Sequence, residues 1–221
     1  MVKIFNDKKH VFWQAFFLTV LFFFIGIVLG VYIEQSRADS LNVAFYNSEA
    51  SLYDSFALGR LVEGASASCE DFKSASVVFA DQIYEEVRSL EKFDDSNKLT
   101  ESVKIIHRKY DLLRTILWMN IMAAKERCSS EINTVVYLYI YDTENVEIKS
   151  EQVVWSRILG DLKEQKGNDI ILIPIAVDQE IVSLEYLIDD YNIQEFPSII
   201  INEEHVISEI SGADDLIQYF D

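Results

Sequence analysis

The side chains best suited to covalent chemistry in this 221-residue chain are its two cysteines, Cys69 and Cys128. Cysteines serve in proteins as structural disulfides, as redox-active pairs or, with further ligands, as zinc sites. Two cysteines alone do not complete a structural zinc site, and their wide spacing excludes a local Cys-x-x-Cys motif. Three interpretations stay open: a structural disulfide, two buried free thiols, or a redox-active pair.

The elements that must position these cysteines are helices. Over residues 40–128 apolar side chains recur at helical spacing, which predicts an antiparallel helical region. A first helix is expected to begin at Ser40, a second opens at Cys69 after a break over 64–68, and a third closes at Cys128 after a turn over 93–100. In such a hairpin the cysteines lie side by side, and a disulfide closing about sixty residues would stabilise the fold by roughly 4 kcal/mol.

Other catalytic constellations find little support. The sequence holds no GxSxG, HExxH, P-loop or dinucleotide fingerprint, so it predicts no cofactor. His107 reads as a packing or surface histidine, since no second histidine or cysteine lies near it in sequence. Asp142 and Glu144 close a predicted strand and leave a weak ion site open, but the sequence predicts no metal centre.

The segment Val11–Ile33 is apolar apart from Gln14 and Thr19, and about 20 such residues cross a bilayer as a helix. It therefore predicts a transmembrane helix over 11–33. The alternative is a cleaved signal peptide, whose apolar region is usually only ~7–15 residues and ends in a small-x-small site.

The flanks of this segment set its orientation. Lys3, Lys8 and Lys9 precede it, and an excess of Lys and Arg keeps that end, residues 1–10, in the cytoplasm. The rest of the chain is then expected outside the cell membrane, where disulfides form. Gly26 and Gly30 make a GxxxG step through which two anchors could pair as a homodimer.

The formal net charge of the chain is −18. Residues 1–10 hold three lysines and one aspartate, so the remainder carries −20. Such an acidic surface repels phosphate backbones, which excludes nucleic acid as a partner.

From Ile132 onward the apolar pattern changes to strands alternating with helices. The expected strands are 132–142, 169–178, 196–202 and 205–211, and the expected helices are 150–167, 180–193 and 214–220. The order βαβαββα predicts an α/β layer domain over residues 132–221.

The stretch YNIQEFPSIIINEEHVISEISGADDLIQYF (191–220) resembles the thioredoxin family. In that family a cis proline opens a central strand, and a hairpin and a final helix close the sheet. Pro197 matches that proline, Phe196 the residue before it, and Gly212 the turn ahead of the last helix. The resemblance covers 132–221, and its most specific part is the FPSIII step.

The sequence departs from the redox-active members of the family at one place. They carry CxxC after the first strand, where the helix N-terminus stabilises a thiolate. Here that region reads TENVEIKSEQ (143–152), and Val146 and Lys149 stand nearest the missing pair. Without a thiolate, thiol–disulfide exchange cannot begin there.

The resemblance implies that a peptide-binding surface is kept although the cysteine pair is absent. Family members pair an extended segment with the backbone beside the cis proline, a form of strand addition. Phe196, Pro197, Val146 and Lys149 are therefore candidate peptide-binding residues. The alternative is that Phe196 packs in the core, Pro197 is architectural and Lys149 is a solvated residue.

Three functions follow from these observations. The first is a membrane-anchored, extracytoplasmic thioredoxin-like protein without CxxC, which binds a protein or extended peptide and is not catalytic. The second is a thiol-disulfide oxidoreductase or isomerase that uses Cys69 and Cys128. The third is a structural part of an envelope complex that docks through its helical region, and exposed apolar patches on residues 99–123 would favour it.

Overall fold

The computed structural model of the chain describes residues 8–64, 67–94, 101–128 and 132–220. The chain divides into two compact units, Met1–Tyr46 and Asn47–Asp221. Lys3, the predicted break over 64–68 and the predicted turn over 93–100 lie wholly or partly outside the described residues.

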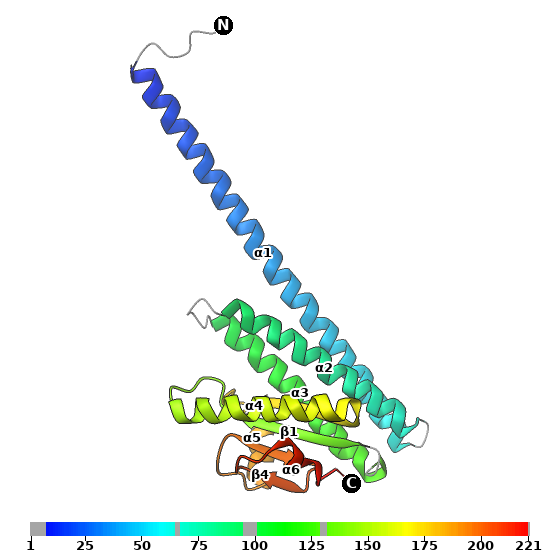
Figure 1. Cartoon of the computed structure of the whole chain (residues 1–221). Helices are drawn as coiled ribbons and strands as arrows, with labels where there is room; N and C mark the ends of the chain where they lie inside the picture. Colours follow the sequence, from blue (N-terminus) through cyan, green and yellow to red (C-terminus); the bar gives the residue numbers. More distant parts are fainter. Residues whose placement is uncertain (1–7, 65–66, 95–100, 129–131, 221) are drawn as a thin grey trace. The chain divides into compact units, whose positions relative to one another are not determined.

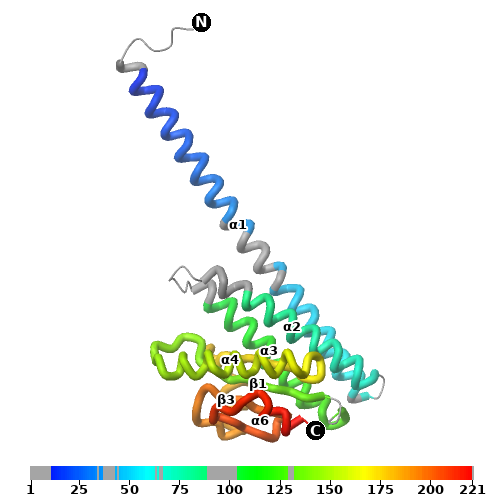
Figure 2. The backbone as a smooth tube through the Cα atoms, in the orientation of Figure 1, coloured from blue at the N-terminus to red at the C-terminus, as the bar shows by residue number. Residues whose placement is uncertain are grey.

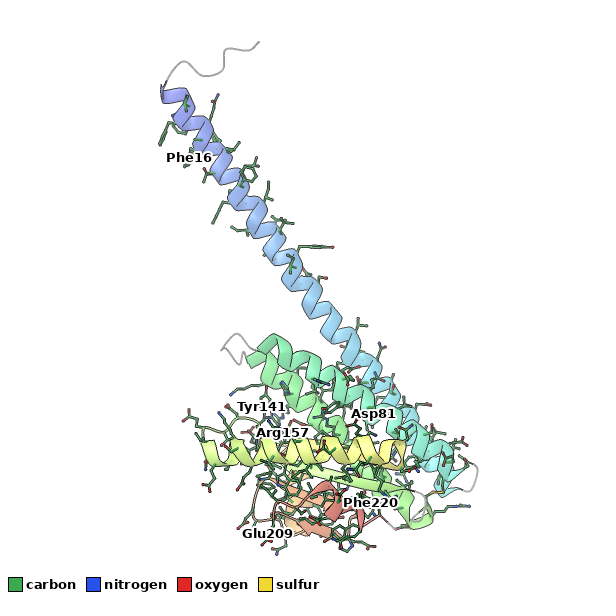
Figure 3. All side chains as sticks on the ribbon, in the orientation of Figure 1. Phe16, Asp81, Tyr141, Arg157, Glu209 and Phe220 are labelled. Atoms are coloured by element: carbon green, nitrogen blue, oxygen red, sulfur yellow. A yellow bond between two sulfur atoms is a disulfide. The ribbon has the colours of Figure 1, made fainter. Side chains whose placement is uncertain are left out.

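The first unit consists of the leading part of helix α1 (Lys8–Glu63). Within it Val11–Ile33 is long and apolar enough to cross a membrane, with a mean hydropathy of 2.7 and no part buried in the protein. Its apolar side chains, Phe16 among them, stand out all around the helix (Figure 3).

The expectation that a helix begins at Ser40 is wrong, because α1 runs through that position without a break. No glycine or proline occurs between Val31 and Leu58, so nothing in the sequence forces the helix to end. A polar residue with capping chemistry does not start a helix where the preceding turn is already helical.

The second unit begins with a helical layer formed by the end of α1, α2 (Cys69–Asp94) and α3 (Glu101–Cys128), which confirms the predicted hairpin (Figure 1). Polar contacts between helices fix their alignment. The Ser48 hydroxyl donates to Glu86 Oε2 over 2.6 Å, and the Tyr110 hydroxyl donates to the same oxygen over 3.0 Å. The buried apolar side chains of this layer include Leu52, Phe72, Phe79, Ile83, Leu113, Leu117 and Ile121.

The predicted order of elements after residue 131 is confirmed. The elements are β1 (Asn133–Tyr139), α4 (Val146–Lys166), the 3-10 turn η1 (Gly167–Asp169), β2 (Ile170–Ala176), α5 (Val182–Asp190), β3 (Ser198–Ile201), β4 (His205–Ile207) and α6 (Ala213–Ile217). Gly167 ends α4 with a positive φ of 54°, a conformation that favours glycine. Figure 2 follows the backbone from the helical layer into this region.

The four strands form one mixed sheet in the order β2-β1-β3-β4. β1 and β2 are parallel, as the helical crossover through α4 requires, whereas β3 runs antiparallel to both β1 and β4. The register places Leu138 opposite Ser198 and Val135 opposite Ile201.

Both faces of the sheet are covered. α4 and α6 pack together on one face, while α3 and α2 pack against β2. The core between the sheet and the α4–α6 layer contains Val135, Tyr137, Trp155, Leu159, Leu162, Ile170, Ile199, Ile201, Leu216 and Phe220. Alternate residues point to the opposite face, so the strands read as nearly continuous apolar runs.

Strand β2 is an edge of the sheet, and nearby residues remove or bond the amides that point away from the sheet. The Val177 amide donates to the Tyr139 carbonyl of β1, so the amides of the even-numbered residues in β2 point outward. Pro174 has no amide hydrogen, and the Ala176 amide donates to Asp111 Oδ1 of α3 over 3.2 Å. A proline and a covering helix are devices that block unwanted strand pairing at an edge.

Candidate functional site

The candidate peptide-binding residues predicted from the sequence gather at one end of the sheet. β1 ends at Tyr139, and the chain then crosses to the first turn of α4. Because Leu138 lies opposite Ser198, the antiparallel register brings Pro197 and Phe196 to this same end. The structure therefore places both halves of the predicted surface at the carboxyl end of β1.

The first half of this surface is the N-terminus of α4. The Asn145 side chain caps the helix, since its Oδ1 accepts the Glu147 amide over 2.9 Å. The capping begins α4 four residues earlier than the helix predicted from Ser150. Val146 is 74% exposed and Lys149 is exposed, so both side chains are open to a partner.

The second half is the segment ahead of β3. The Phe196–Pro197 peptide bond is cis; Pro197 is buried and Phe196 is half-buried. Within the described residues, the amide and the carbonyl of Phe196 take part in no backbone hydrogen bond. A backbone donor and acceptor without a backbone partner are what an added strand would pair with.

The connection between β1 and α4 is held by side chains. Gln152 of α4 bonds Ile140 twice: its Oε1 accepts the Ile140 amide over 2.9 Å, and its Nε2 donates to the Ile140 carbonyl over 3.1 Å. Asp178 accepts the amides of Tyr141 and Asp142, over 2.9 and 2.8 Å. Asp142 also pairs with Lys104 of α3 over 3.1 Å. These bonds fix the loop that carries Val146.

A buried ion pair that the sequence reasoning missed lies near the carboxyl ends of β1 and β2. Arg114 Nη1 donates to Asp111 Oδ1 over 3.2 Å, and both side chains are almost fully buried. Burial raises the pKa of Asp111 to about 6, while the Arg114 charge and the Ala176 amide oppose that rise. The sequence does carry a signal for this pair, because Asp111 and Arg114 fall on the same side of α3 as its buried apolar residues.

His107 lies one helical turn before Asp111 and is also buried. Its ring lies 4.3 Å from that of Tyr141, centroid to centroid, at the start of the loop toward α4. The sequence interpretation of His107 as a packing histidine agrees with this position. In the part of the chain that the structure describes, no three His, Cys, Asp or Glu side chains are grouped to hold a metal ion.

The two cysteines are joined in a disulfide with a Cα–Cα distance of 5.6 Å, as the structural interpretation predicted. It links the first residue of α2 to the last residue of α3, and Cys128 is 1% exposed. This bond lies at the amino end of β1, because Lys125 of the last α3 turn contacts Thr134. Seven residues of β1, about 20 Å, separate it from the Phe196 end of the sheet.

A second polar cluster lies at the amino end of β1. Lys125 Nζ contacts Glu203 Oε2 over 2.5 Å, and Glu203 Oε1 accepts from Trp118 Nε1 over 3.2 Å and from the Thr134 hydroxyl over 2.7 Å. Asn202 Oδ1 accepts a hydrogen bond from the Thr134 amide over 3.0 Å. The strands predicted over 196–202 and 205–211 leave residues 203 and 204 as a turn, and nothing in that pattern indicates that the Glu203 side chain points inward.

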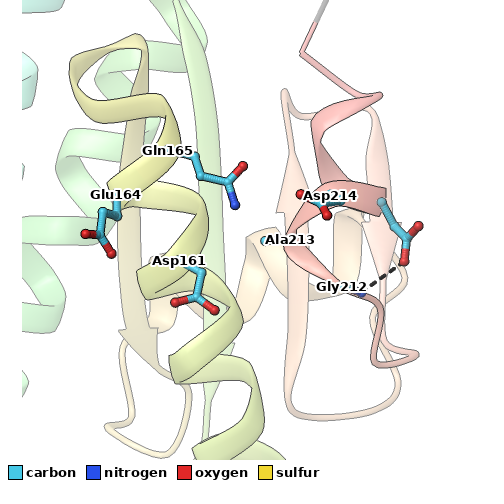
Figure 4. A pocket seen from close by; sticks show the side chains of 7 residues that line it. Asp161, Glu164, Gln165, Gly212, Ala213 and Asp214 are labelled. Atoms are coloured by element: carbon cyan, nitrogen blue, oxygen red, sulfur yellow. Dashed lines mark hydrogen bonds between the residues drawn. The ribbon is translucent and has the colours of Figure 1, made fainter.

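The cavities bordered by described residues include two that lie away from the Phe196 end. One, of about 670 Å³, is bordered by the Lys125–Glu203 cluster, and the other, of about 510 Å³, lies between α4 and α6 (Figure 4). The second is lined by the carboxylates of Asp161, Glu164, Asp214 and Asp215. Asp215 already accepts the Gly212 amide over 3.1 Å as a helix cap. All four acids are exposed, so they form a solvated acidic face.

No protein-family model matches the sequence, and no curated protein is similar to it.

Proposed function

We propose that the chain is a membrane-anchored, extracytoplasmic thioredoxin-like protein that binds an extended protein segment and does not exchange disulfides. The observation that carries this proposal is the placement of the chain's only two cysteines. They form a disulfide at the amino end of β1, whereas Val146, Lys149 and Phe196 lie toward its carboxyl end.

The element order supports the family assignment. A parallel β-α-β unit is followed by a strand that begins just after Pro197, by a hairpin and by a final helix. This is the succession that the thioredoxin resemblance implies for residues 132–221. The absence of the family's redox motif does not argue against this assignment, because one fold hosts many functions.

Location and orientation follow from the apolar helix. Val11–Ile33 meets the length and hydropathy that a single span needs, and its lysine-rich N-terminal flank favours the cytoplasmic side. The disulfide in the following unit fits a domain outside the cytoplasm.

Binding at the Phe196 end would use the backbone rather than a thiol. The open amide and carbonyl of Phe196 would pair with an extended segment, and the exposed Val146 side chain would contact its apolar residues. Lys149 adds a positive charge to that edge and would favour acidic residues in the bound segment.

The alternative, thiol exchange by Cys69 and Cys128, has less support. A catalytic disulfide must expose a sulfur to an attacking thiolate; Cys128 is 1% exposed, and only the half-buried Cys69 could be attacked. The pair also lies about 20 Å from the surface that would hold a substrate.

Site-specific photo-crosslinking tests the proposal in intact cells with the full-length chain. A photoreactive residue at Val146 is expected to form a discrete adduct with another polypeptide, whereas one at Gln165, exposed near the other end of the same helix, is not. Lys149→Glu should reduce the Val146 adduct, because it reverses the charge proposed to favour acidic residues in the bound segment. Equal adducts from both positions, or none at Val146, would contradict the proposed surface.

A further inference from the structure

Two loops lie at the carboxyl ends of the parallel strands, where the proposed binding surface begins. Residues 140–145 lead from β1 to the first turn of α4, and residues 177–181 lead from β2 to α5. Asp178 joins the two loops, because its carboxylate accepts the amides of Tyr141 and Asp142. A displacement of the second loop is therefore transmitted to the first, which leads into the exposed start of α4.

The first of these loops is held by α3. Lys104 Nζ pairs with Asp142 Oδ2 over 3.1 Å, and the His107 ring lies 4.3 Å from the Tyr141 ring, centroid to centroid. The Lys104 pair is exposed to solvent, and such pairs contribute little to stability. The His107 side chain is only 2% exposed. The ring contact is therefore the firmer of these two contacts.

The second loop is held by the same face of α3. Arg108 Nη2 donates to the Glu180 carbonyl over 2.9 Å, and Asp111 Oδ1 accepts the Ala176 amide at the end of β2. Glu180 has a positive φ of 52°, which is uncommon for a residue with a side chain and persists where surrounding contacts hold it. Positions 104, 107, 108 and 111 stand at three- and four-residue steps, so they share one side of the helix.

We propose that His107 and Arg108 are positioning residues of the binding surface. From the helical layer they hold the two loops in the arrangement that presents the first turn of α4 to an extended protein segment. They act through the Tyr141 ring and the Glu180 carbonyl and do not themselves touch the segment. A binding surface keeps its geometry when neighbouring side chains lock the loops that carry it. This inference rests on the proposed function, because it assigns control of that surface to a helix outside residues 132–221.

Amide hydrogen exchange in the full-length protein in lipid nanodiscs measures the positioning without a binding partner. Arg108→Met removes a donor from an exposed side chain, so the fold should persist. This variant and His107→Ala should each speed exchange of the Tyr141 and Asp142 amides at least about tenfold, because the loops open locally more often. Arg108→Lys keeps a donor and His107→Phe keeps a ring, so both should restore most of the protection.

Gly59→Ala is the control for a merely structural effect. Its added Cβ would lie 2.7 Å from Asn120 Oδ1, so it disturbs the packing of the helical layer. Asn120 lies 13 residues beyond His107 on α3, about 20 Å along the helix. Gly59→Ala should therefore change exchange of the Tyr141 and Asp142 amides by less than about twofold.

The Val146 photo-crosslink in intact cells then reports binding by the same variants. If the competent arrangement falls to about a third of the population, the apparent affinity falls about threefold. Arg108→Met and His107→Ala should lower the adduct yield by at least about that factor, and the two conservative variants should restore it. Gly59→Ala should leave the yield unchanged.

The two readouts separate this inference from the proposed function. Unchanged exchange in both variants, or an adduct loss that Gly59→Ala reproduces, would overturn the positioning role even where the natural protein forms the Val146 adduct. Faster exchange with a full adduct yield would also overturn it, because binding would then not need the loops to be held. If the natural protein forms no adduct, the proposed function fails and the positioning role falls with it, whatever the exchange rates.

Discussion

Lys125 Nζ of α3 lies 2.5 Å from Glu203 Oε2 in the turn between β3 and β4, and both side chains are largely buried. The pair joins two segments 78 positions apart in the chain. Glu203 holds a positive φ of 62°, and its other carboxylate oxygen accepts from Trp118 and Thr134. One carboxylate thus connects the helical layer, β1 and the hairpin.

Lys125→Met should therefore be severely destabilising. Removing the ammonium leaves a buried carboxylate without its charge partner, which costs about 3–5 kcal/mol. Glu203→Gln added to Lys125→Met should restore at least half of that loss, because no unpaired charge remains. Urea unfolding followed by tryptophan fluorescence measures both variants. A single-variant cost below about 1 kcal/mol, with additive effects in the pair, would show that the contact is weak.

Gly59 of α1 is expected to be indispensable for packing of the helical layer. A Cβ at this position would lie 2.7 Å from Asn120 Oδ1 and 3.2 Å from Phe72 Cε2. Asn120 is buried and donates to the Ser55 carbonyl, so it has little room to move. Gly59→Ala should lower the free energy of unfolding by about 1–3 kcal/mol despite its gain in helix propensity.

Gly160→Ala is the matched control for Gly59→Ala. Gly160 lies within α4, is exposed, and has no atom within 4 Å of an added Cβ. The same substitution should raise the free energy of unfolding there by about 0.5–1 kcal/mol. Thermal unfolding of both variants checks the pair, and the account fails if the two substitutions shift stability in the same direction.

Asp111 should give the fold a distinctive pH dependence. Its pKa rises from 3.8 in the unfolded chain to about 6 in the folded protein, so the folded state holds this proton more tightly. The stabilisation from that proton is fully present below pH 3.8 and is lost as the pH rises through about 6. The loss is on the order of 3 kcal/mol, since one pKa unit corresponds to ~1.4 kcal/mol.

Asp111→Asn removes this titration while keeping an oxygen for the Ala176 amide. The stability of the natural protein relative to this variant should fall between pH 4 and pH 6.5, as measured by urea unfolding at each pH. Parallel pH profiles for the two proteins would show that Asp111 does not take up the proton on folding.

The order of elements could be predicted because each has a local cause. The apolar runs of β1 and β2 have strand composition, Gly167 ends α4, and Cys69 and Cys128 sit at the ends of a helical hairpin. Phe196 and Pro197 could be placed at the start of a strand by the FPSIII step. These features depend on residues close in sequence, which a single chain displays directly.

Side-chain partners across long separations could not be predicted in this way. Glu203 looks like a turn residue until Lys125 is known to lie against it, and the inward position of Asp111 does not reveal its partner until the Ala176 amide is placed against α3. The prediction that a helix begins at Ser40 was wrong for a related reason, because α1 begins at Lys8 and continues through Ser40. Which charge is buried depends on the packing of elements distant in sequence.

Replacing Cys69 and Cys128 with serine is expected to weaken the fold without removing binding at the Phe196 end. Loss of a disulfide closing 59 positions should lower the free energy of unfolding by about 4 kcal/mol in the chain-entropy model. Urea unfolding measures that loss, and the Val146 photo-crosslink measures binding. Loss of the crosslink in a variant that remains folded would favour a role for the cysteines in binding.

Thiol trapping of the full-length protein in intact cells, with mass analysis under graded reduction, tests the central claim most directly. The account predicts one bond between Cys69 and Cys128 that resists mild reductant, because Cys128 is buried and the proposed location is an oxidising compartment. A bond that opens readily or cycles with a partner would contradict a purely structural disulfide and favour thiol exchange. Two free thiols would contradict the extracytoplasmic location itself.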